Sequence, residues 1–508
     1  MINERGEPMS LTIDQLAAVA CGSVDPVDAG ATAVTGGIAI SAQEVAEGGL
    51  FAAVPGTRVH GATYAGQSGG SAVLTDNEGL ELMRASGNSQ PAIVVDDVRA
   101  VLGVVSDAIY ASPSKELTVI GVTGTSGKTT TTYLLEGALM AAGRKVGLIG
   151  TTGTRIDGRK VPSKLTTPEA PALHGLFRTM VDEGVTHVVM EVSSHALMLG
   201  RVDGIHFDAT GFLNLSQDHL DFHDTMDEYF EAKALLFDPA SPLHAPETVI
   251  CVDDAWGQQM AERATSDGVT VATVSVTSPD ATWHVINGWV ADNGVQHVEL
   301  GGDVGKQEIE VSLPGAFNIS NAAVAWALLE AIGCATEQAR QGMGRVSVPG
   351  RMERIDCGQD FLAVVDYAHK PAALGAVLDT LRGQTKNRII AVVGAGGDRD
   401  VTKRPLMGAE AVRGADVVII TDDNPRSEDP ETIRQALYDG AVDANTDSEI
   451  HNIGDRAEAI RTAVAEARTG DAVVVAGKGH ETGQEVAGVV HDFDDRIELR
   501  EALKGRPE

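Results

Sequence analysis

The stretch "GVTGTSGKTTT", which contains Lys128, has the residue types that bind the phosphates of a nucleoside triphosphate. The usual pattern is GxxxxGK[ST], and Gly127, Lys128 and Thr129 fill its last three positions. Val122 occupies the slot of the first glycine, with Gly124 nearby, so the loop is a variant of that pattern. An ordinary turn with an exposed lysine is the alternative. The apolar run before the loop and the helical pattern after it favour phosphate binding.

The chemistry expected of this loop is the neutralisation of charge on phosphate oxygens. Backbone N–H groups and the positive end of the following helix would face the phosphates. The ammonium of Lys128 can reach the β- and γ-phosphates, and the hydroxyl of Thr129 can bind Mg²⁺. The loop residues expected to contact ATP are Gly124, Thr125, Ser126, Gly127, Lys128, Thr129 and Thr130.

Acids, histidines and a lysine downstream of the loop could complete a metal and phosphate centre. In "VVMEVSSHALMLGR", Glu191 ends an apolar strand, which is where an acid for the metal is expected. "NLSQDHLDFH" offers Asp218, His219 and His223 after another strand. "DEYFEAKALLF" places Lys233 on a helix. Taken singly, each has a simpler interpretation: the acids and histidines are common in turns, His219 and His223 could share a helix face, and Lys233 could be a solvated lysine. Because all of them follow a phosphate loop, a metal centre is favoured.

A second polar turn, "TDDNPRSEDP" at residues 421–430, follows the apolar run "ADVVII". Asp, Asn and Pro favour turns, but a turn does not require Arg426. This arginine stands where a parallel strand opens onto a binding crevice. A capped strand end with a solvated arginine is the alternative. The nearby "GAGGDRD" lacks the third glycine of GxGxxG, so we do not expect it to bind NAD.

Three α/β domains must position these residues. The 508 residues suffice for about three domains of typical size. Short apolar runs alternate with helical stretches throughout, which is typical of parallel sheets covered by helices. We expect a small N-terminal α/β domain at 1–112, a central phosphate-loop domain with a parallel sheet at 113–348, and a Rossmann-like doubly wound domain at 349–508.

Composition excludes several classes of protein. The formal net charge of −33 opposes nucleic-acid binding and attraction to anionic membranes. The four cysteines are widely separated, so neither a disulfide framework nor a zinc site is expected. No apolar run approaches the roughly 18 residues of a membrane span, and the start "MINERGEPMS" does not have the pattern of a signal peptide. We therefore expect a cytoplasmic protein.

The motifs occur in an order that resembles the Mur ligase family. They are "TGTSGKTT", "LTTPEAP", "EVSSHAL", "NLSQDHLDFH", "YFEAK", "GAFNISNAAVA", "PGRMERID", "DYAHKP", "GAGGDRDVTKRPLMG", "DNPRSEDP" and "GKGHE". The resemblance covers roughly residues 35 to 485. It implies an ATP-dependent ligase that adds the third amino acid to the peptidoglycan precursor UDP-MurNAc-L-Ala-D-Glu through an acyl phosphate. It also implies Mg²⁺ as cofactor, ATP as co-substrate, small-molecule substrates without nucleic acid or membrane insertion, and a monomer.

The resemblance assigns roles at the phosphate centre. Lys128, Lys233 and His219 would be catalytic, with Lys233 carbamylated so that a metal meets an anion rather than an ammonium. The metal ligands would be Thr129, Glu191, His219 and carbamylated Lys233. The further contacts to ATP would be Asn318, Arg351 and Asp366, the last toward the ribose.

The resemblance also assigns the two other substrates. The UDP-MurNAc-dipeptide would be bound by Ile40, Ala42, Thr57, Arg58, Val59, Thr166, Thr167, Ser193, Leu199 and Arg201. Ala42 stands where a serine is common, and Leu199 where some relatives have glutamine. The incoming amino acid would be bound by Arg399, Asp423, Asn424, Pro425, Arg426, Gly477 and Glu481.

The incoming amino acid expected from these residues is meso-diaminopimelate. Its distal end carries a carboxylate and an ammonium, whereas lysine has only the ammonium. The fork of Arg426 suits a carboxylate, and Asp423 and Asn424 are expected to meet the ammonium. The alternatives are the same reaction with L-lysine, a phosphotransferase, a silent binding module, and an enzyme similar to folylpolyglutamate synthase. A kinase does not need "DNPR" or "GKGHE", and the synthase would not predict "DNPR".

Overall fold

The computed structural model describes residues 10–162, 165–219, 222–265, 270–290, 295–302 and 305–506. Three sheets, each covered by helices, organise these residues into an α/β architecture, as the alternation of apolar runs predicts. Residues 1–9, on which the expectation about a signal peptide depends, lie outside the described residues. None of the helices in the described ranges combines the length and apolar character that a bilayer span requires.

The N-terminal sheet has the strand order β2-β7-β6-β5-β4, in which only β2 is antiparallel to its neighbour. Its strands are short apolar runs buried on both faces, which suits a sheet covered by helices on both sides. The strands are β2 (Ser23–Asp25), β4 (Ile38–Ala39), β5 (Leu50–Ala52), β6 (Ala72–Thr75) and β7 (Ala92–Val94), beside the pair β1 (Leu11–Thr12) and β3 (Ala33–Val34). The helices are α1 (Ile13–Val19), α2 (Asn77–Ala85) and α3 (Val98–Ile109), with 3-10 turns η1 (Val27–Ala29), η2 (Ala42–Glu44), η3 (Gly61–Gln67) and η4 (Pro113–Glu116).

The central sheet has the order β11-β10-β9-β12-β8-β13-β14-β15-β16-β17-β18 in the described part of the chain. The run from β9 to β16 is parallel, and antiparallel strands extend it at both edges. The strands are β8 (Thr118–Thr123), β9 (Val146–Gly150), β10 (Gly153–Ile156), β11 (Arg159–Val161), β12 (His187–Glu191), β13 (Ala209–Phe212), β14 (Glu247–Cys251), β15 (Thr270–Ser275), β16 (Trp283–Val290), β17 (Gln296–Gly301) and β18 (Gln307–Val311).

Helices cover both faces of the central sheet. On one face, α4 (Lys128–Ala141), α9 (Ala316–Ala331) and α10 (Glu337–Met343) pack on a core that includes Leu134 and Trp326. On the other face, a core that includes Phe177 and Met260 lies under α5 (Ala170–Asp182), α6 (Ser194–Met198), α7 (Met226–Ala234) and α8 (Ala255–Ala264).

The C-terminal sheet has the order β19-β20-β24-β21-β22-β23 and is parallel except for β19. Its strands are β19 (Glu353–Arg354), β20 (Leu362–Asp366), β21 (Ile389–Val393), β22 (Val417–Ile420), β23 (Glu449–Asn452) and β24 (Ala472–Ala476). One face is covered by α11 (Pro371–Gln384), α12 (Lys403–Gly414) and α13 (Pro430–Asp443), the other by α14 (Arg456–Glu466) and α15 (Asp495–Lys504). A hairpin of β25 (Gly483–Val486) and β26 (Val489–Asp492) follows β24.

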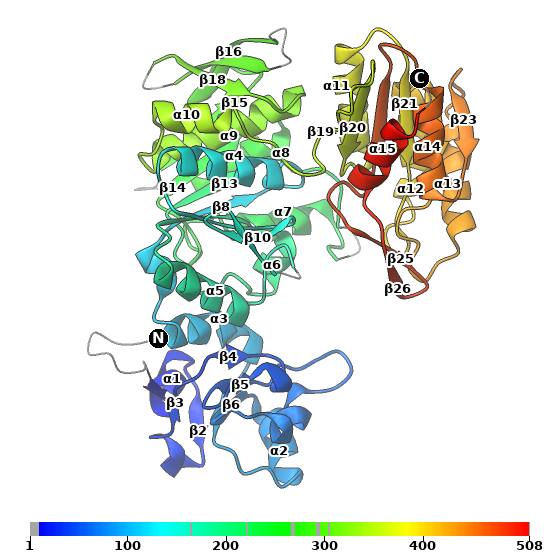
Figure 1. The fold of residues 1–508 in the computed structure, drawn as a ribbon. Coiled ribbons are helices and arrows are strands. Elements are labelled where there is room, and N and C mark those ends of the chain that lie inside the picture. The colour runs from blue at the N-terminus through cyan, green and yellow to red at the C-terminus, as the bar shows by residue number, and fades with distance from the viewer. Residues whose placement is uncertain are drawn as a thin grey trace.

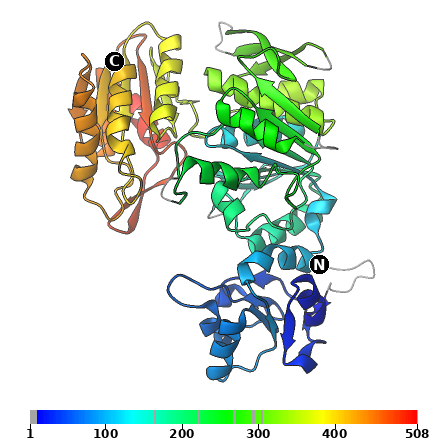
Figure 2. The same ribbon diagram turned by 180° about the vertical axis from the view of Figure 1, so that it is seen from behind.

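The three sheets are arranged around the central one. Figures 1 and 2 show the N-terminal sheet at one end of the molecule and the C-terminal sheet beside the central sheet. In the view of Figure 1, the β25–β26 hairpin lies below the C-terminal sheet. The division of the chain near residues 112 and 348 remains a proposal, which the separate sheets support.

Candidate active site

The loop between β8 and α4 folds as the phosphate-binding pattern predicts. Gly127 immediately precedes α4 with a φ of 90°, in the left-handed region. A Cβ atom at this position would lie 2.3 Å from Oδ1 of Asn321 on α9. A side chain is therefore excluded both by conformation and by space, and the backbone of the loop stays open to an approaching anion.

The Lys128 ammonium is held by its own loop. Its Nζ atom donates to the carbonyl oxygens of Gly124 at 2.7 Å and Thr125 at 3.2 Å. Burial lowers the pKa of Lys128 to about 8, and the nearby Lys370 adds to this shift. A phosphate beside this amine would favour its charged form, so the loop is suited to an anionic ligand.

Glu191 is the last residue of β12 and organises the space beside the loop. Its Oε1 accepts from the Thr129 hydroxyl at 2.9 Å and from the Thr151 backbone N–H at 2.8 Å. Its Oε2 accepts from the Thr151 hydroxyl at 2.9 Å. β8 and β12 are parallel neighbours, so their carboxyl ends bring the Thr129 hydroxyl and this carboxylate together. Carboxylate and hydroxyl oxygens are ligands that suit Mg²⁺.

Lys233 lies on α7, as predicted, but it is not a solvated lysine. The side chain is 1% exposed. Its Nζ atom donates to the Thr123 hydroxyl at 3.3 Å and to the Gly124 carbonyl at 3.1 Å. Burial lowers the pKa of Lys233 well below its usual range, and the neighbouring Lys128 and Lys370 lower it further. This shift favours the neutral amine, which is the form that reacts with carbon dioxide.

His219 stands in a cluster of aromatic rings that follows β13. Its Nε2 atom lies 3.0 Å from Oδ2 of Asp218, and its ring centroid lies 5.0 Å from that of His195. Burial lowers the pKa of His219 to about 3, so the imidazole is neutral and able to bind a metal. His195, in the motif "EVSSHAL", was not predicted from the sequence to have a role. Neither His219 nor His223 lies in a helix, so the interpretation of these two residues as one face of a helix is wrong.

The donor set at this centre fits Mg²⁺ on one condition. The oxygens of Thr129 and Glu191 are suitable ligands, and the neutral His219 adds a nitrogen. Lys233 contributes nothing to a hard cation as an amine, but a carbamate on its Nζ would present two oxygens. The fit therefore depends on the modification that the family resemblance implies.

The C-terminal sheet contributes residues to the same centre. Arg351 lies over the ring of Tyr367 at 4.4 Å and donates from Nη2 to the Thr129 hydroxyl at 3.4 Å. Its Nε atom is buried without a hydrogen-bond partner among the described residues, so an anion here would satisfy it. Lys370, which "DYAHKP" contains and which the sequence reasoning missed, pairs with Asp218 at 2.5 Å.

Two further residues predicted to contact ATP are buried. The carboxylate of Asp366 accepts from the backbone N–H groups of Met352 and Ala368, both at 2.7 Å. Burial raises the pKa of Asp366. Asn318 is 3% exposed, and its Nδ2 donates to the Pro314 carbonyl at 2.7 Å. Both side chains are thus fixed by their own domains.

The central residues predicted to bind the UDP-sugar peptide lie together beside Glu191. Thr166 lies with its hydroxyl 3.2 Å from that of Thr151. Thr167 donates to the Glu191 carbonyl at 2.9 Å and accepts from the backbone N–H of Ser193 at 3.4 Å. Arg201 donates to the Thr167 carbonyl at 3.3 Å. Leu199 caps the C-terminal end of α6 nearby in the chain.

The N-terminal residues predicted for the same substrate share one edge of their sheet. Ile40 and Ala42 follow β4, and residues 57–59 follow β5. β4 and β5 are parallel neighbours, so both segments leave the sheet at its carboxyl edge. Ile40 and Val59 are exposed, which leaves them accessible to a ligand.

The residues predicted to read the incoming amino acid follow three parallel strands. Arg399 follows β21 on an exposed turn, residues 423–426 follow β22, and Gly477 and Glu481 follow β24. A Cβ atom at Gly477 (φ 122°) would lie 2.5 Å from Oδ2 of Asp423, so this close approach requires glycine. β22, β21 and β24 lie side by side, and the three segments therefore meet at one edge.

Arg426 is anchored in a left-handed conformation with a φ of 54°. Its Nη1 donates to the Gly397 carbonyl at 2.6 Å, and its Nε lies 3.5 Å from Oε2 of Glu485. Its backbone N–H donates to the Glu485 carbonyl at 3.0 Å, and its carbonyl accepts from the Ala487 backbone N–H at 2.7 Å. The β25 strand thus fixes the loop and aims the guanidinium.

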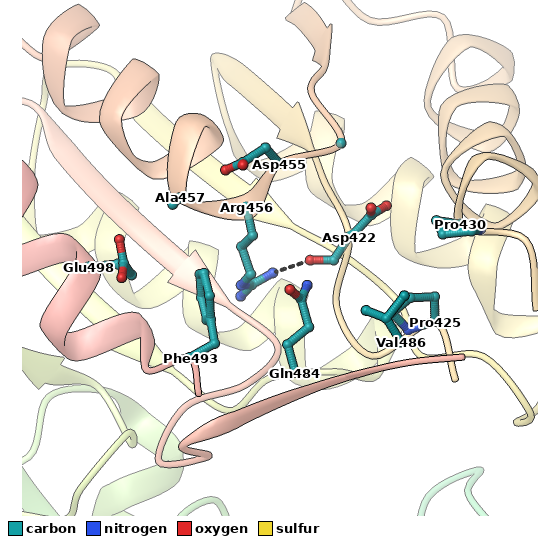
Figure 3. A pocket seen from close by; sticks show the side chains of 11 residues that line it. Asp422, Pro425, Pro430, Asp455, Arg456, Ala457, Gln484, Val486, Phe493 and Glu498 are labelled. Carbon is teal, nitrogen blue, oxygen red and sulfur yellow. Dashed lines mark hydrogen bonds between the residues drawn. The ribbon is translucent and has the colours of Figure 1, made fainter. Parts of the chain in front are cut away.

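A cavity of about 340 Å³ lies against the same loop (Figure 3). Asp422 and Pro425 line it, together with Gln484 and Phe493. Figure 3 shows Arg456 reaching toward the loop, where its Nη1 donates to the Asp422 carbonyl at 3.4 Å. The buried Arg456 is itself paired with Asp495 at 2.7 Å.

Comparison with known proteins identifies the family. The chain matches the Mur ligase middle domain over residues 122–329 and the Mur ligase, glutamate ligase domain over residues 350–479. It is 60% identical, over 462 residues that make up 89% of each chain, to the UDP-N-acetylmuramoyl-L-alanyl-D-glutamate--2,6-diaminopimelate ligase of Corynebacterium glutamicum.

More distant relatives agree with this match. The protein of the same name from Streptomyces coelicolor is 47% identical over 475 residues, which make up 92% of each chain. A solved structure of a protein so named superposes with a TM-score of 0.66 at 35% identity, covering 92% of this chain and 94% of that one. The chain therefore belongs to the Mur ligase family.

Proposed function

We propose that this chain is the ATP-dependent ligase that joins meso-diaminopimelate to UDP-MurNAc-L-Ala-D-Glu in the synthesis of peptidoglycan precursors. The relatives that carry this name match nearly the whole chain. The observation that carries the proposal is the contact between the central and C-terminal domains beside the phosphate loop. Arg351 and Lys370 of the C-terminal sheet contact Thr129 and Asp218 beside the phosphate loop.

The reaction begins with transfer of the γ-phosphoryl group of ATP to a free carboxylate of the D-glutamyl residue. A carboxylate is a poor electrophile until one of its oxygens becomes a leaving group, and the acyl phosphate provides this. The amine of the incoming amino acid, after losing a proton, attacks the acyl carbon. The tetrahedral intermediate collapses to the amide and inorganic phosphate, and ADP is the second product.

The protein contributes mainly positioning and neutralisation of charge. Lys128 and the loop N–H groups hold the phosphates, and Arg351 adds a guanidinium from the other domain. Glu191, Thr129, His219 and a carbamate on Lys233 would hold Mg²⁺, which supplies further neutralisation of the phosphate charge. The residues that follow β22 and β24 hold the amino acid, so that its amine reaches the acyl phosphate between the two sheets.

Phosphate release tests this proposal. The ligase releases phosphate only when ATP, UDP-MurNAc-L-Ala-D-Glu and the correct amino acid are all present. A panel of amino acids that includes meso-diaminopimelate and L-lysine identifies the third substrate. Transfer of phosphate without any amino acid would indicate a phosphotransferase, and use of lysine alone would overturn the assignment of the amino acid. Cytoplasmic location and a monomeric state belong to this proposal as well.

A further inference from the structure

The ammonium of Lys478 is buried against the turn at residues 423–426, which is predicted to bind the incoming amino acid. Lys478 follows Gly477 after β24, and its side chain is 0% exposed. Its Nζ donates to Oδ1 of Asn424 at 2.9 Å and to Oε2 of Glu481 at 3.3 Å, and it lies 3.9 Å from Oδ1 of Asp423. Three of the predicted amino-acid contacts therefore converge on this one cation, which the sequence reasoning left without a role.

The orientation of the Asn424 amide is fixed by its neighbours. Its Oδ1 faces the Lys478 ammonium and also the backbone N–H of Glu485 at 3.0 Å. Both of these groups can only donate, so the atom that faces them must be the oxygen. The nitrogen of the amide then points the other way, and it donates to Oε2 of Glu481 at 2.9 Å.

An amide held in this way cannot accept a hydrogen bond from a substrate. Its oxygen already accepts two bonds, which fills its two lone pairs. In this geometry the amide is left with a donor for the substrate, which differs from the expectation that Asn424 meets the ammonium of the amino acid. The amide nitrogen has two hydrogens, one of which is donated to Glu481. The other is a donor, and a donor suits a carboxylate. The carboxylates of Asp423 and Glu481 are the groups that remain for an ammonium.

We propose that Lys478 is a positioning residue that makes Asn424 a hydrogen-bond donor, and thereby helps to select an amino acid with a distal carboxylate. The inference rests on the proposed function and adds a second reader of that carboxylate beside Arg426. Without the ammonium, the amide is free to turn and to present its oxygen to the ammonium of lysine. The preference for diaminopimelate over lysine then falls for two reasons. Diaminopimelate loses a hydrogen-bond donor, and lysine gains an acceptor.

The test compares Lys478→Met with the wild-type protein and measures kcat/KM for meso-diaminopimelate and for L-lysine. We expect KM for diaminopimelate to rise about 10- to 100-fold, which is the effect of losing a hydrogen bond that involves a charged group. We expect the ratio of the two kcat/KM values to shift toward lysine, and KM for ATP to change less than about twofold. Lys478→Arg should restore part of the preference.

A double-mutant cycle separates positioning from simple loss of stability. If Lys478 acts through Asn424, the effects of Lys478→Met and Asn424→Ala on selectivity will not add. Arg388→Met is the matched control, because it removes an ion pair with Asp471 (2.8 Å) from the amino-terminal edge of the same sheet. This control should leave the amino-acid preference unchanged.

Asn424→Asp serves if Lys478→Met does not fold, since a carboxylate at this position cannot donate. We expect it to lower kcat/KM for diaminopimelate at least about tenfold relative to lysine. An unchanged preference in both Lys478→Met and Asn424→Asp, or fully additive effects in the cycle, would overturn the inference. A wild-type protein that does not use diaminopimelate would instead overturn the proposed function, so the two failures are distinct.

Discussion

The ammonium of Lys370 lies 2.5 Å from Oδ2 of Asp218, and the same oxygen lies 3.0 Å from Nε2 of His219. An ion pair thus joins the C-terminal domain to a loop of the central domain. Both partners are largely buried, with exposed side-chain fractions of 13% and 16%. Burial raises the pKa of Asp218, but Lys370 and His219 outweigh this effect and hold it well below its usual range.

Lys370→Met tests this contact between the domains. Breaking a largely buried ion pair leaves an unpaired acid and removes a cation near Lys128, so we expect kcat/KM for ATP to fall about 100-fold. The measurement is steady-state phosphate release as a function of ATP concentration. Lys386→Met, on the exposed surface of the same domain, is the control. Wild-type kinetics in Lys370→Met would show that the pair does not support closure.

Lys128→Ala tests the phosphate loop. The substitution removes the ammonium that neutralises the transferred phosphoryl group, so we expect ligation to fall below detection while the melting temperature changes little. Phosphate release and thermal unfolding are measured side by side. Lys145→Ala, an exposed lysine of the same domain, should keep full activity. Near-normal turnover by Lys128→Ala would refute the assignment of the loop.

Lys233 is expected to be carbamylated. In its unprotonated form the amine attacks carbon dioxide, the nitrogen loses a proton, and the product is an N-carboxylate. Lys233→Ala should lose most of its activity and regain part of it with short carboxylic acids, which replace the missing carboxylate. Mass spectrometry or carbon NMR with labelled bicarbonate detects the carbamate directly. A fully active Lys233→Ala variant would argue against the modification.

Arg426→Ala tests the choice of amino acid. The guanidinium is anchored by Gly397 and Glu485, and a carboxylate of the substrate would complete its hydrogen bonds. We expect the wild type to prefer diaminopimelate over lysine by up to roughly 10⁴-fold, and the variant to lose most of this preference. The readout is kcat/KM for both amino acids. Arg413→Ala, an exposed arginine of α12, should keep the wild-type preference.

The free energy of unfolding should decrease in mild acid because His480 is buried. Burial lowers the pKa of His480 to about 4, and Arg351 lowers it further. An unfolded histidine has a pKa near 6.5, so between pH 6.5 and pH 4 the unfolded chain binds more protons. The free energy of unfolding therefore falls as the pH falls, by about 2 kcal/mol between pH 7 and pH 5 from this group.

Thermal unfolding at pH 7 and pH 5 measures this contribution. His480→Gln should lose less stability than the wild type over that interval, because glutamine does not titrate. His491→Gln, at an exposed position of β26, should behave like the wild type. Equal losses in His480→Gln and the wild type would show that this imidazole is not the group responsible.

The sequence was sufficient to predict features that depend on one strand and the turn after it. The phosphate loop after β8, Glu191 at the end of β12 and the polar turn after β22 all follow apolar runs that are easily recognised. Because parallel strands share a carboxyl edge, these turns could also be expected to lie at binding crevices. Other strands were not predicted, among them β16 to β18, whose mixed polar and apolar residues do not stand out from the surrounding chain.

Contacts between distant segments could not be predicted in the same way. Lys370 and Asp218 lie in different domains, and only the relative position of two sheets brings them together. Lys478 is a lysine in a Gly-rich turn, with nothing in its neighbours to show that it is buried on Asn424. The burial of Lys233 is similar, since the helix was expected but the face that points inward was not.

The cavity of about 340 Å³ beside the polar turn has a practical consequence (Figure 3). Among the described residues, its lining includes Asp422 and Pro425 but not Asp423, Asn424 or Arg426. A compound lodged in this cavity would displace the turn without occupying the place of the amino acid. Because coupling between two sites is reciprocal, a compound that weakens amino-acid binding by shifting this turn would itself bind more weakly, by the same factor, once the amino acid is bound.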